Sequence, residues 1–246
     1  ACVNMDQGGA IVDLRPYAAK LEWDIGIGTP HVQEAGYPYL IQEKYRAGYF
    51  THYAGEGTVR YAKLCHNGEE VDLCLCRTHA HFSQEGDCRR LTLDPVEAVF
   101  SALTVKLQTV LTFREGSSAI QIDRHILEMS DPDAQLTINE YMVACYGTTE
   151  YPEDMTGLTL SARRGDEEHP LAYAYKCREF ALPEADGVSC VLPPIKTRVS
   201  LTCQGRDRAG YYKEGYAFSP MFTLGYTGTL KEKEVFTTWL RLERAG

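Results

Sequence analysis

The segment 91–113, LTLDPVEAVFSALTVKLQTVLTF, joins two patterns that decide the fold class. Asp94 is a good helix N-cap, Pro95 suits a first helical turn, and Glu97 can reach back to the N–H of the cap. Apolar residues then follow at helical spacing, at Val96, Val99, Phe100 and Leu103. These features predict one short helix. From 105 to 113 the apolar period changes to two, which predicts a strand with one buried face.

The rest of the chain is dominated by short alternating segments. They are 20–28, 37–45, 48–53, 58–65, 71–77, 119–129, 135–145, 158–162, 171–180, 195–203, 216–226 and 235–242. Asn67-Gly68 is a strong hairpin signal between two of them. The connections are too short for crossover helices. The sequence therefore predicts an all-β fold, a two-sheet antiparallel β-sandwich with one short helix.

Length and composition are those of a globular protein. The chain has 246 residues, of which 44% are hydrophobic, and no linker divides it, so we expect a single domain over 1–246. No apolar run approaches the roughly 18 residues of a membrane span. The sequence opens with Ala1-Cys2, as a mature secreted protein would after its signal peptide is removed. We therefore expect an extracellular protein.

Nine cysteines suggest an oxidising compartment and a disulfide-stabilised fold with one thiol unpaired. The candidates are Cys2, Cys65, Cys74, Cys76, Cys88, Cys145, Cys177, Cys190 and Cys203. A zinc site is the alternative for one group of ligands, namely Cys65, Cys74, Cys76, His79, His81 and Cys88. Zinc knuckles usually space their cysteines by two to four residues, whereas Cys74 and Cys76 are separated by one. We therefore favour disulfides, and expect neither a metal nor another cofactor.

The net charge of −9 disfavours nucleic acid and anionic membrane surfaces as partners. Positively charged protein partners are the natural expectation, although negative charge also serves solubility alone.

Several stretches together resemble a known family. They are 21–27 (LEWDIGI), 58–64 (TVRYAKL), 91–94 (LTLD) and the strand 105–113. In this order they resemble the secreted poxvirus chemokine-binding proteins, the viral CC-chemokine inhibitors and their parapoxvirus relatives. The resemblance implies a disulfide-bonded, non-enzymatic β-sandwich that sequesters a host chemokine and blocks its receptor binding. A binder of granulocyte-macrophage colony-stimulating factor or interleukin-2 is the alternative within the family, although the Trp-Asp-Pro-Trp-Val run expected of that branch is missing.

A decoy for basic chemokines needs an acidic surface with aromatic anchors. The candidate contact residues are Glu69, Glu70, Asp72, Tyr49, Tyr53, Glu115, Tyr151, Glu153 and Asp154. Further acidic residues stand at Glu150, Asp166, Glu167 and Glu168. Ordinary solvated loop charge is the simpler explanation of any one of these acidic clusters, because loops are generally polar and exposed. The strand 105–113 itself departs from the expectation, because Lys106, Gln108 and Thr112 form its polar face.

An enzyme is the alternative outside this class. Asp123, Glu128 and Glu140 stand on adjacent expected strands, and paired carboxylates can hydrolyse glycosides. The alternation predicts that these three are exposed, and Arg124 interrupts the apolar face beside them. No nucleophile elbow, phosphate loop or zinc-protease helix is present. The sequence therefore favours a binding protein over a zinc-dependent or carboxylate-dependent enzyme.

Overall fold

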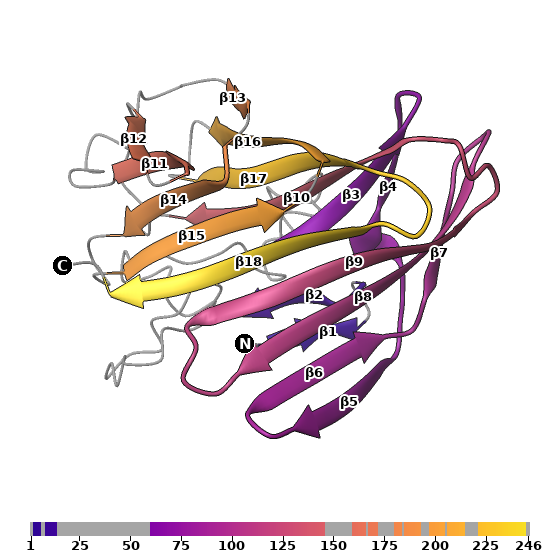
Figure 1. Cartoon of the computed structure of the whole chain (residues 1–246), viewed down its shortest axis with the longest axis horizontal. Coiled ribbons are helices and arrows are strands. Elements are labelled where there is room, and N and C mark those ends of the chain that lie inside the picture. The colour runs from indigo at the N-terminus through magenta and orange to yellow at the C-terminus, as the bar shows by residue number, and fades with distance from the viewer. Residues whose placement is uncertain are drawn as a thin grey trace, which may run out of the picture.

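The computed structural model describes residues 2–5, 8–13, 60–145, 159–165, 167–171, 180–183, 185–192, 197–204, 206–214 and 221–244. These residues form two antiparallel β-sheets with a shared apolar core, the larger in front in Figure 1. The two-sheet all-β architecture expected from the alternating segments is confirmed. The described part contains no helix with the length and apolarity that a membrane span requires.

Among the described residues, the smaller sheet has eight strands. Their order is β1 (Cys2–Asn4), β2 (Ala10–Asp13), β3 (Arg60–His66), β10 (Leu136–Cys145), β17 (Met221–Leu230), β16 (Arg206–Glu214) and β13 (Phe180–Pro183), with β4 (Glu69–Asp72) paired to β3. A single 3₁₀ turn, η5 (Leu73–Leu75), follows β4.

The larger sheet has ten strands in the described part of the chain. Their order is β12 (Glu167–Leu171), β11 (Thr159–Arg164), β14 (Gly187–Leu192), β15 (Thr197–Gln204), β18 (Val235–Arg244), β9 (Ala119–Met129), β8 (Thr104–Arg114), β6 (Cys88–Leu93) and β5 (Ala80–Glu85), with β7 (Val96–Val99) paired to β8. The pairing of β18 with β9 joins strands from the two halves of the chain into one continuous sheet.

The segment 91–113 contains three strands with short breaks at 94–95 and 100–103 and no helix, so the predicted helix is wrong. The strand expected at 105–113 is β8, and Val105, Leu107 and Leu111 on its inner face are buried. The expected helical stretch is instead β7, whose Ala98 pairs with Val105. β6 and β7 both pair with β8 and are interrupted at Asp94 and Pro95. Proline cannot donate to a ladder, so the break falls where the N–H is missing.

Most other expected strands are confirmed, with shifted ends. The segment 119–129 matches β9, and 135–145 differs from β10 by one residue. The segments 20–28, 37–45 and 48–53 lie outside the described residues. The expected strand 171–180 falls largely outside them as well, between β12 and β13.

The core lies between the two sheets and follows the alternation of each strand. Leu64 and Ile138 come from the smaller sheet, and Leu107, Phe236 and Leu240 from the larger. All five are almost completely buried. Burying a large apolar side chain contributes roughly 1.5–3 kcal/mol, so the interleaved faces hold the sheets together.

A buried ion pair crosses this core. Arg124 on β9 donates from Nε to Oε1 of Glu140 on β10 at 2.8 Å, and from Nη1 to Oγ1 of Thr109 on β8 at 2.6 Å. The side chains of Arg124 and Glu140 are only 5% and 0% exposed. The expectation that Glu140 is exposed is therefore wrong, because its strand turns it towards the core with Ile138.

The predicted turn at Asn67-Gly68 is confirmed between β3 and β4. Both residues have positive φ, 49° and 83° respectively. Such values suit a two-residue hairpin turn, and a side chain at the second position is strained.

Gly68→Ala is expected to lower the free energy of unfolding by about 1–2 kcal/mol. The strain is purely conformational, because an added Cβ would meet no atom within 4 Å. Urea unfolding measures it, with Asn67→Gly as the control that keeps positive φ accessible. Equal stability of Gly68→Ala and wild type would contradict this turn geometry.

The predicted disulfide framework is not seen among the described side chains. Cys65, Cys76, Cys88 and Cys190 are free thiols there. Cys88 and Cys190 are buried, and burial raises the pKa of the Cys190 thiol, so it behaves as a small apolar side chain. The side chains of Cys2, Cys74, Cys145 and Cys177 lie outside the description.

Candidate ligand-binding cleft

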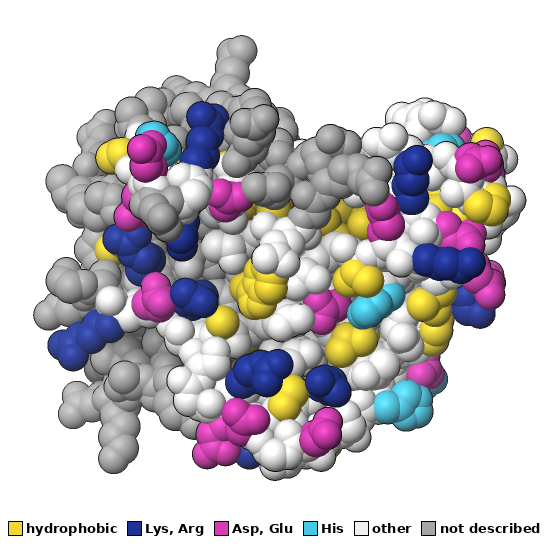
Figure 2. Space-filling model, viewed as in Figure 1, with side chains coloured by type: hydrophobic (Ala, Val, Ile, Leu, Met, Phe, Trp, Pro, Cys, Tyr) yellow, Lys and Arg dark blue, Asp and Glu magenta, His cyan; other side chains and the backbone are white. Residues whose placement is uncertain are grey.

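A cleft of about 580 Å³ lies on the outer face of the larger sheet, over β11, β14, β15 and β18. This size is within the range of small-molecule sites. Figure 2 shows this face of the molecule, with charged side chains of both signs gathered over β11, β12 and β14. The cleft therefore combines an open floor with a charged rim.

Strand alternation places the floor residues. On β15, Val199 and Leu201 point into the core, so Ser200 and Thr202 face outwards. On β18, buried Leu240 similarly leaves Trp239 and Arg241 on the outer face. On both strands, alternate residues form the core and the residues between them line the polar cleft.

The middle of the floor is one register row. Gly187 of β14 lies opposite Thr202, and Thr202 lies opposite Trp239. A Cβ on Gly187 would stand 3.1 Å from Cγ2 of Thr202 and 3.5 Å from Cβ of Arg163. The absence of a side chain here keeps the floor open between Arg163 and Thr202.

The next row is made of hydroxyl groups. Ser161 of β11 and Ser189 of β14 lie in register with their Oγ atoms 2.7 Å apart, and Ser200 follows on β15. A serine hydroxyl can donate and accept, so this row suits a ligand that carries hydroxyl groups itself.

Glu168 is the best-held carboxylate on the rim. It accepts a hydrogen bond from the Ser161 hydroxyl and another from Nη1 of Arg198 at 2.5 Å. The Ser161 hydrogen bond and then the bond and charge of Arg198 hold the pKa of Glu168 below its usual range. Its side chain remains 49% exposed. It is an ionised proton acceptor that a ligand can reach.

A second ion pair lies on β18. Nη1 of Arg241 stands 3.6 Å from Oε1 of Glu243, and Glu243 lies opposite Arg198 in the sheet register. With Asp186, which accepts from the Gly165 N–H at 2.6 Å, these groups complete the charged lining. Chemically, the cleft offers an indole surface, several hydroxyls, guanidinium donors and an ionised carboxylate.

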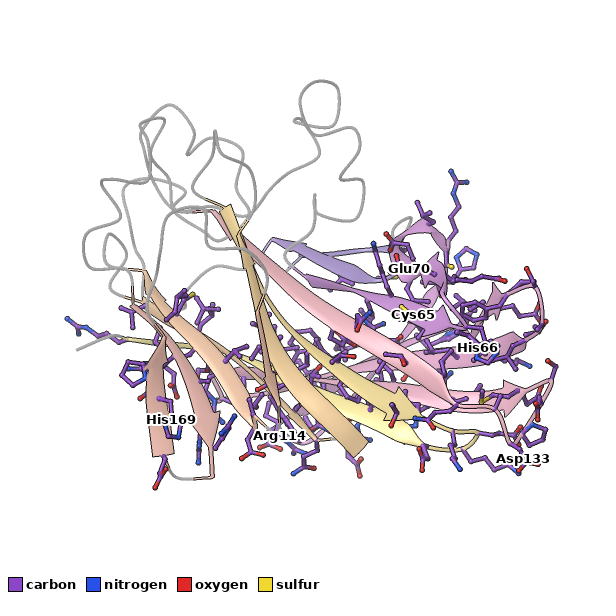
Figure 3. All side chains as sticks on the ribbon, turned by 90° about the horizontal axis from the view of Figure 1, so that it is seen from above. Cys65, His66, Glu70, Arg114, Asp133 and His169 are labelled. Atoms are coloured by element: carbon purple, nitrogen blue, oxygen red, sulfur yellow. The ribbon has the colours of Figure 1, made fainter. Side chains whose placement is uncertain are left out.

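The structure places the predicted acidic contact residues away from this cleft. Glu69, Glu70 and Asp72 belong to β4, at the other end of the molecule from His169 of β12 (Figure 3). Glu69 accepts from the Ser101 N–H at 2.7 Å, and Glu70 pairs with Lys63 at 3.4 Å. These carboxylates serve contacts within the chain.

The remaining predicted contact residues do not form one surface in the described structure. Glu115 is exposed just after β8, and its N–H donates to the Asp87 carbonyl. Tyr49, Tyr53, Glu150, Tyr151, Glu153, Asp154 and Asp166 lie outside the described residues. Glu167 pairs with His169. Among the acidic residues singled out from the sequence, its neighbour Glu168 is the one that lines the cleft.

The described residues contain no group of three or more His, Cys, Asp or Glu side chains able to hold a metal ion. His81, one of the ligands of the zinc alternative, instead bonds Asp94 through Nε2 at 2.9 Å. Cys65 lies near Glu70 and accepts from Asn139 at 3.2 Å. Burial and the Glu70 charge raise the pKa of the Cys65 thiol. The geometry therefore gives the zinc alternative no support among these residues.

Sequence patterns did not identify six of the residues that line the cleft, namely Ser161, Ser189, Arg198, Ser200, Trp239 and Arg241. The alternation of 197–204 and 235–244 places several of them on an outer face. An outer face is polar by default in an antiparallel sheet, so alternation alone does not mark a binding site.

The fold is similar to that of several solved structures. Candidate aldose 1-epimerases from Klebsiella pneumoniae subsp. pneumoniae (TM-score 0.57, 9% identity, 99% of this chain and 76% of that one) and Escherichia coli K12 (0.54, 10%, 97% and 94%) match along nearly the whole chain. A galactose mutarotase-like protein from Clostridium acetobutylicum also matches (0.54, 7%, 98% and 90%). No protein-family description matches the chain, and no curated protein matches it in sequence.

These similarities overturn the resemblance to poxvirus chemokine-binding proteins. The fold is that of the galactose mutarotase-like and aldose 1-epimerase-like β-sandwiches. The resemblance depended in part on a helix before the strand at 105–113, and that segment is β7. The predicted cytokine sequestration and the predicted lack of enzymatic activity are therefore wrong.

Proposed function

We propose that the protein binds an aldose in the cleft over β11, β14, β15 and β18 and catalyses the exchange of its anomers. One observation carries the proposal. A cleft of sugar size is lined by Trp239, by hydroxyl donors and by an ionised carboxylate, on a fold shared with mutarotase-like proteins. The apolar face of a sugar ring packs on an indole, while its hydroxyls need polar partners of both kinds.

Anomer exchange requires proton transfer at two oxygens. A base takes the proton of the anomeric hydroxyl, the bond between the anomeric carbon and the ring oxygen breaks, and the ring oxygen gains a proton from water. Closure on the other face of the carbonyl reverses these transfers. Glu168 is the proposed base, because its carboxylate is ionised, lines the cleft and remains accessible to a ligand. Arg198 and Ser161 position its carboxylate.

Sugar binding can be measured with the protein's own fluorescence. The chain has two tryptophans, Trp23 and Trp239, so Trp23→Phe leaves Trp239 as the reporter. Titration of this variant with glucose, galactose and mannose is expected to change the Trp239 emission saturably for at least one sugar. The control is sorbitol, an open-chain polyol without a ring to stack. An unchanged emission with every aldose would contradict binding in this cleft.

Gly187→Leu is expected to weaken aldose binding at least about tenfold, because the added side chain occupies the floor between Arg163 and Thr202. Gly187→Ala adds one methyl group and is the graded control. Both are measured by the same fluorescence titration, with urea unfolding to confirm the fold. Undiminished affinity in a folded Gly187→Leu protein would place the ligand elsewhere.

A further inference from the structure

The outer face of the larger sheet continues beyond the cleft onto β9. Gln121 lies opposite Trp239, and Asp123 lies opposite Thr237. On β9 the inward side chains are Ile120 and Ile122, so Gln121 and Asp123 share the outer face with the indole. The polar surface next to Trp239 is thus formed by a strand that contributes nothing to the cleft itself.

The Asp123 carboxylate is held in one orientation. Nε2 of Gln121 donates to its two oxygens at 3.2 and 3.0 Å, and Oγ1 of Thr237 donates to Oδ1 at 2.7 Å. Because the Gln121 amide directs its NH₂ group at Asp123, its carbonyl oxygen is left to accept from a ligand. The three side chains therefore present ordered acceptors that need no reorganisation on binding.

The surface is also wide enough for a second ring. Strands in a sheet are spaced by about 4.8 Å, so β9 and then β8 extend the floor by about 10 Å beyond β18. On β8, Val110 lies opposite Asp123 on this face, and Thr112, which is only 5% exposed, lies opposite Gln121.

We infer that Gln121, Asp123 and Thr237 form a second sugar subsite beside Trp239, so that the ligand is a saccharide of two or more units. The inference rests on the proposed function. It places the reducing-end ring in the cleft on Trp239 and the next ring over β9, the neighbouring strand. Gln121 accepts a hydroxyl hydrogen bond from that ring, and the free lone pairs of Asp123 accept another.

The test compares mono- and disaccharides by fluorescence titration of the Trp23→Phe protein. The ligands are glucose, galactose and mannose, with disaccharides that carry each of them at the reducing end. At least one disaccharide is expected to bind about tenfold more tightly than its reducing-end monosaccharide. Gln121→Leu is expected to remove that advantage while leaving the monosaccharide affinity unchanged, and Asp123→Asn to reduce it.

The outcomes separate the two proposals. Equal affinity for mono- and disaccharides would overturn the second subsite and leave the proposed function intact. A parallel loss of affinity for both ligands in Gln121→Leu would overturn it as well, because the side chain would then support the cleft rather than a second ring. Binding of neither ligand would overturn the proposed function and with it this inference.

Discussion

Glu140→Leu is expected to lower the free energy of unfolding by about 3–5 kcal/mol. The substitution removes the carboxylate that Nε of Arg124 bonds at 2.8 Å and leaves the guanidinium, only 5% exposed, between the two sheets with Thr109. An unpaired buried charge costs far more than the missing contact alone. Urea unfolding followed by tryptophan fluorescence measures the difference.

A double variant separates the charge from the packing. Arg124→Met with Glu140→Leu fills the same space with apolar groups, and replacing a whole buried pair in this way is often neutral or stabilising. We expect the double variant to recover most of the stability. Glu128→Leu is the surface control, because Glu128 is 74% exposed and 4.0 Å from Lys106, and its effect should stay below about 1 kcal/mol. A Glu140→Leu effect as small as this control would contradict a buried pair.

Glu168→Gln is expected to lower the rate of anomer exchange about 10²- to 10⁴-fold, the usual contribution of a general base. The amide keeps the size of the side chain and cannot accept the proton. Glu167→Gln is the matched control, because Glu167 stands beside it on β12, is 80% exposed, and pairs with His169 instead. Equal rates for Glu168→Gln and Glu167→Gln would remove Glu168 from the chemistry.

The pH dependence follows from the lowered pKa of Glu168. The ionised form is the base, so activity should persist as pH falls through the ordinary glutamate pKa of about 4.3 and decline only below it. The Ser161 hydroxyl is the largest cause of the lowering. Ser161→Ala should therefore move the acidic limb of the rate profile to higher pH. An unshifted limb would contradict this hydrogen bond as the cause.

Local patterns were sufficient for most of the fold. Alternation along 105–113 and 119–129 predicted strands whose buried faces build the core, and Asn67-Gly68 predicted the turn where both φ values are positive. The segment after Asp94 carried good helix-start residues and was nevertheless a strand. Its pairing with β8 is a tertiary effect, and such pairing overrides local propensity.

The candidate site was much less accessible from sequence. The sequence pattern favoured Glu69, Glu70 and Asp72 as a contact surface for a basic partner. In the structure Glu69 accepts a hydrogen bond from Ser101 and Glu70 forms an ion pair with Lys63. The cleft is assembled from β11, β14, β15 and β18, and its register is a property of the folded sheet. From the sequence, Glu168 was one of several charged residues expected in a loop. Its contacts with Ser161 and Arg198 distinguish it from its neighbour Glu167, and these contacts are visible only in the structure.

The central claim is that the cleft beside Trp239 binds an aldose and exchanges its anomers. The most direct measurement is two-dimensional exchange NMR of the two anomeric proton signals of an aldose, with the wild-type protein and with Trp239→Ala. We expect exchange cross-peaks to grow with wild-type protein and to be absent, as in buffer, with a folded Trp239→Ala protein. Exchange at the buffer rate with wild-type protein and every aldose tested would contradict it.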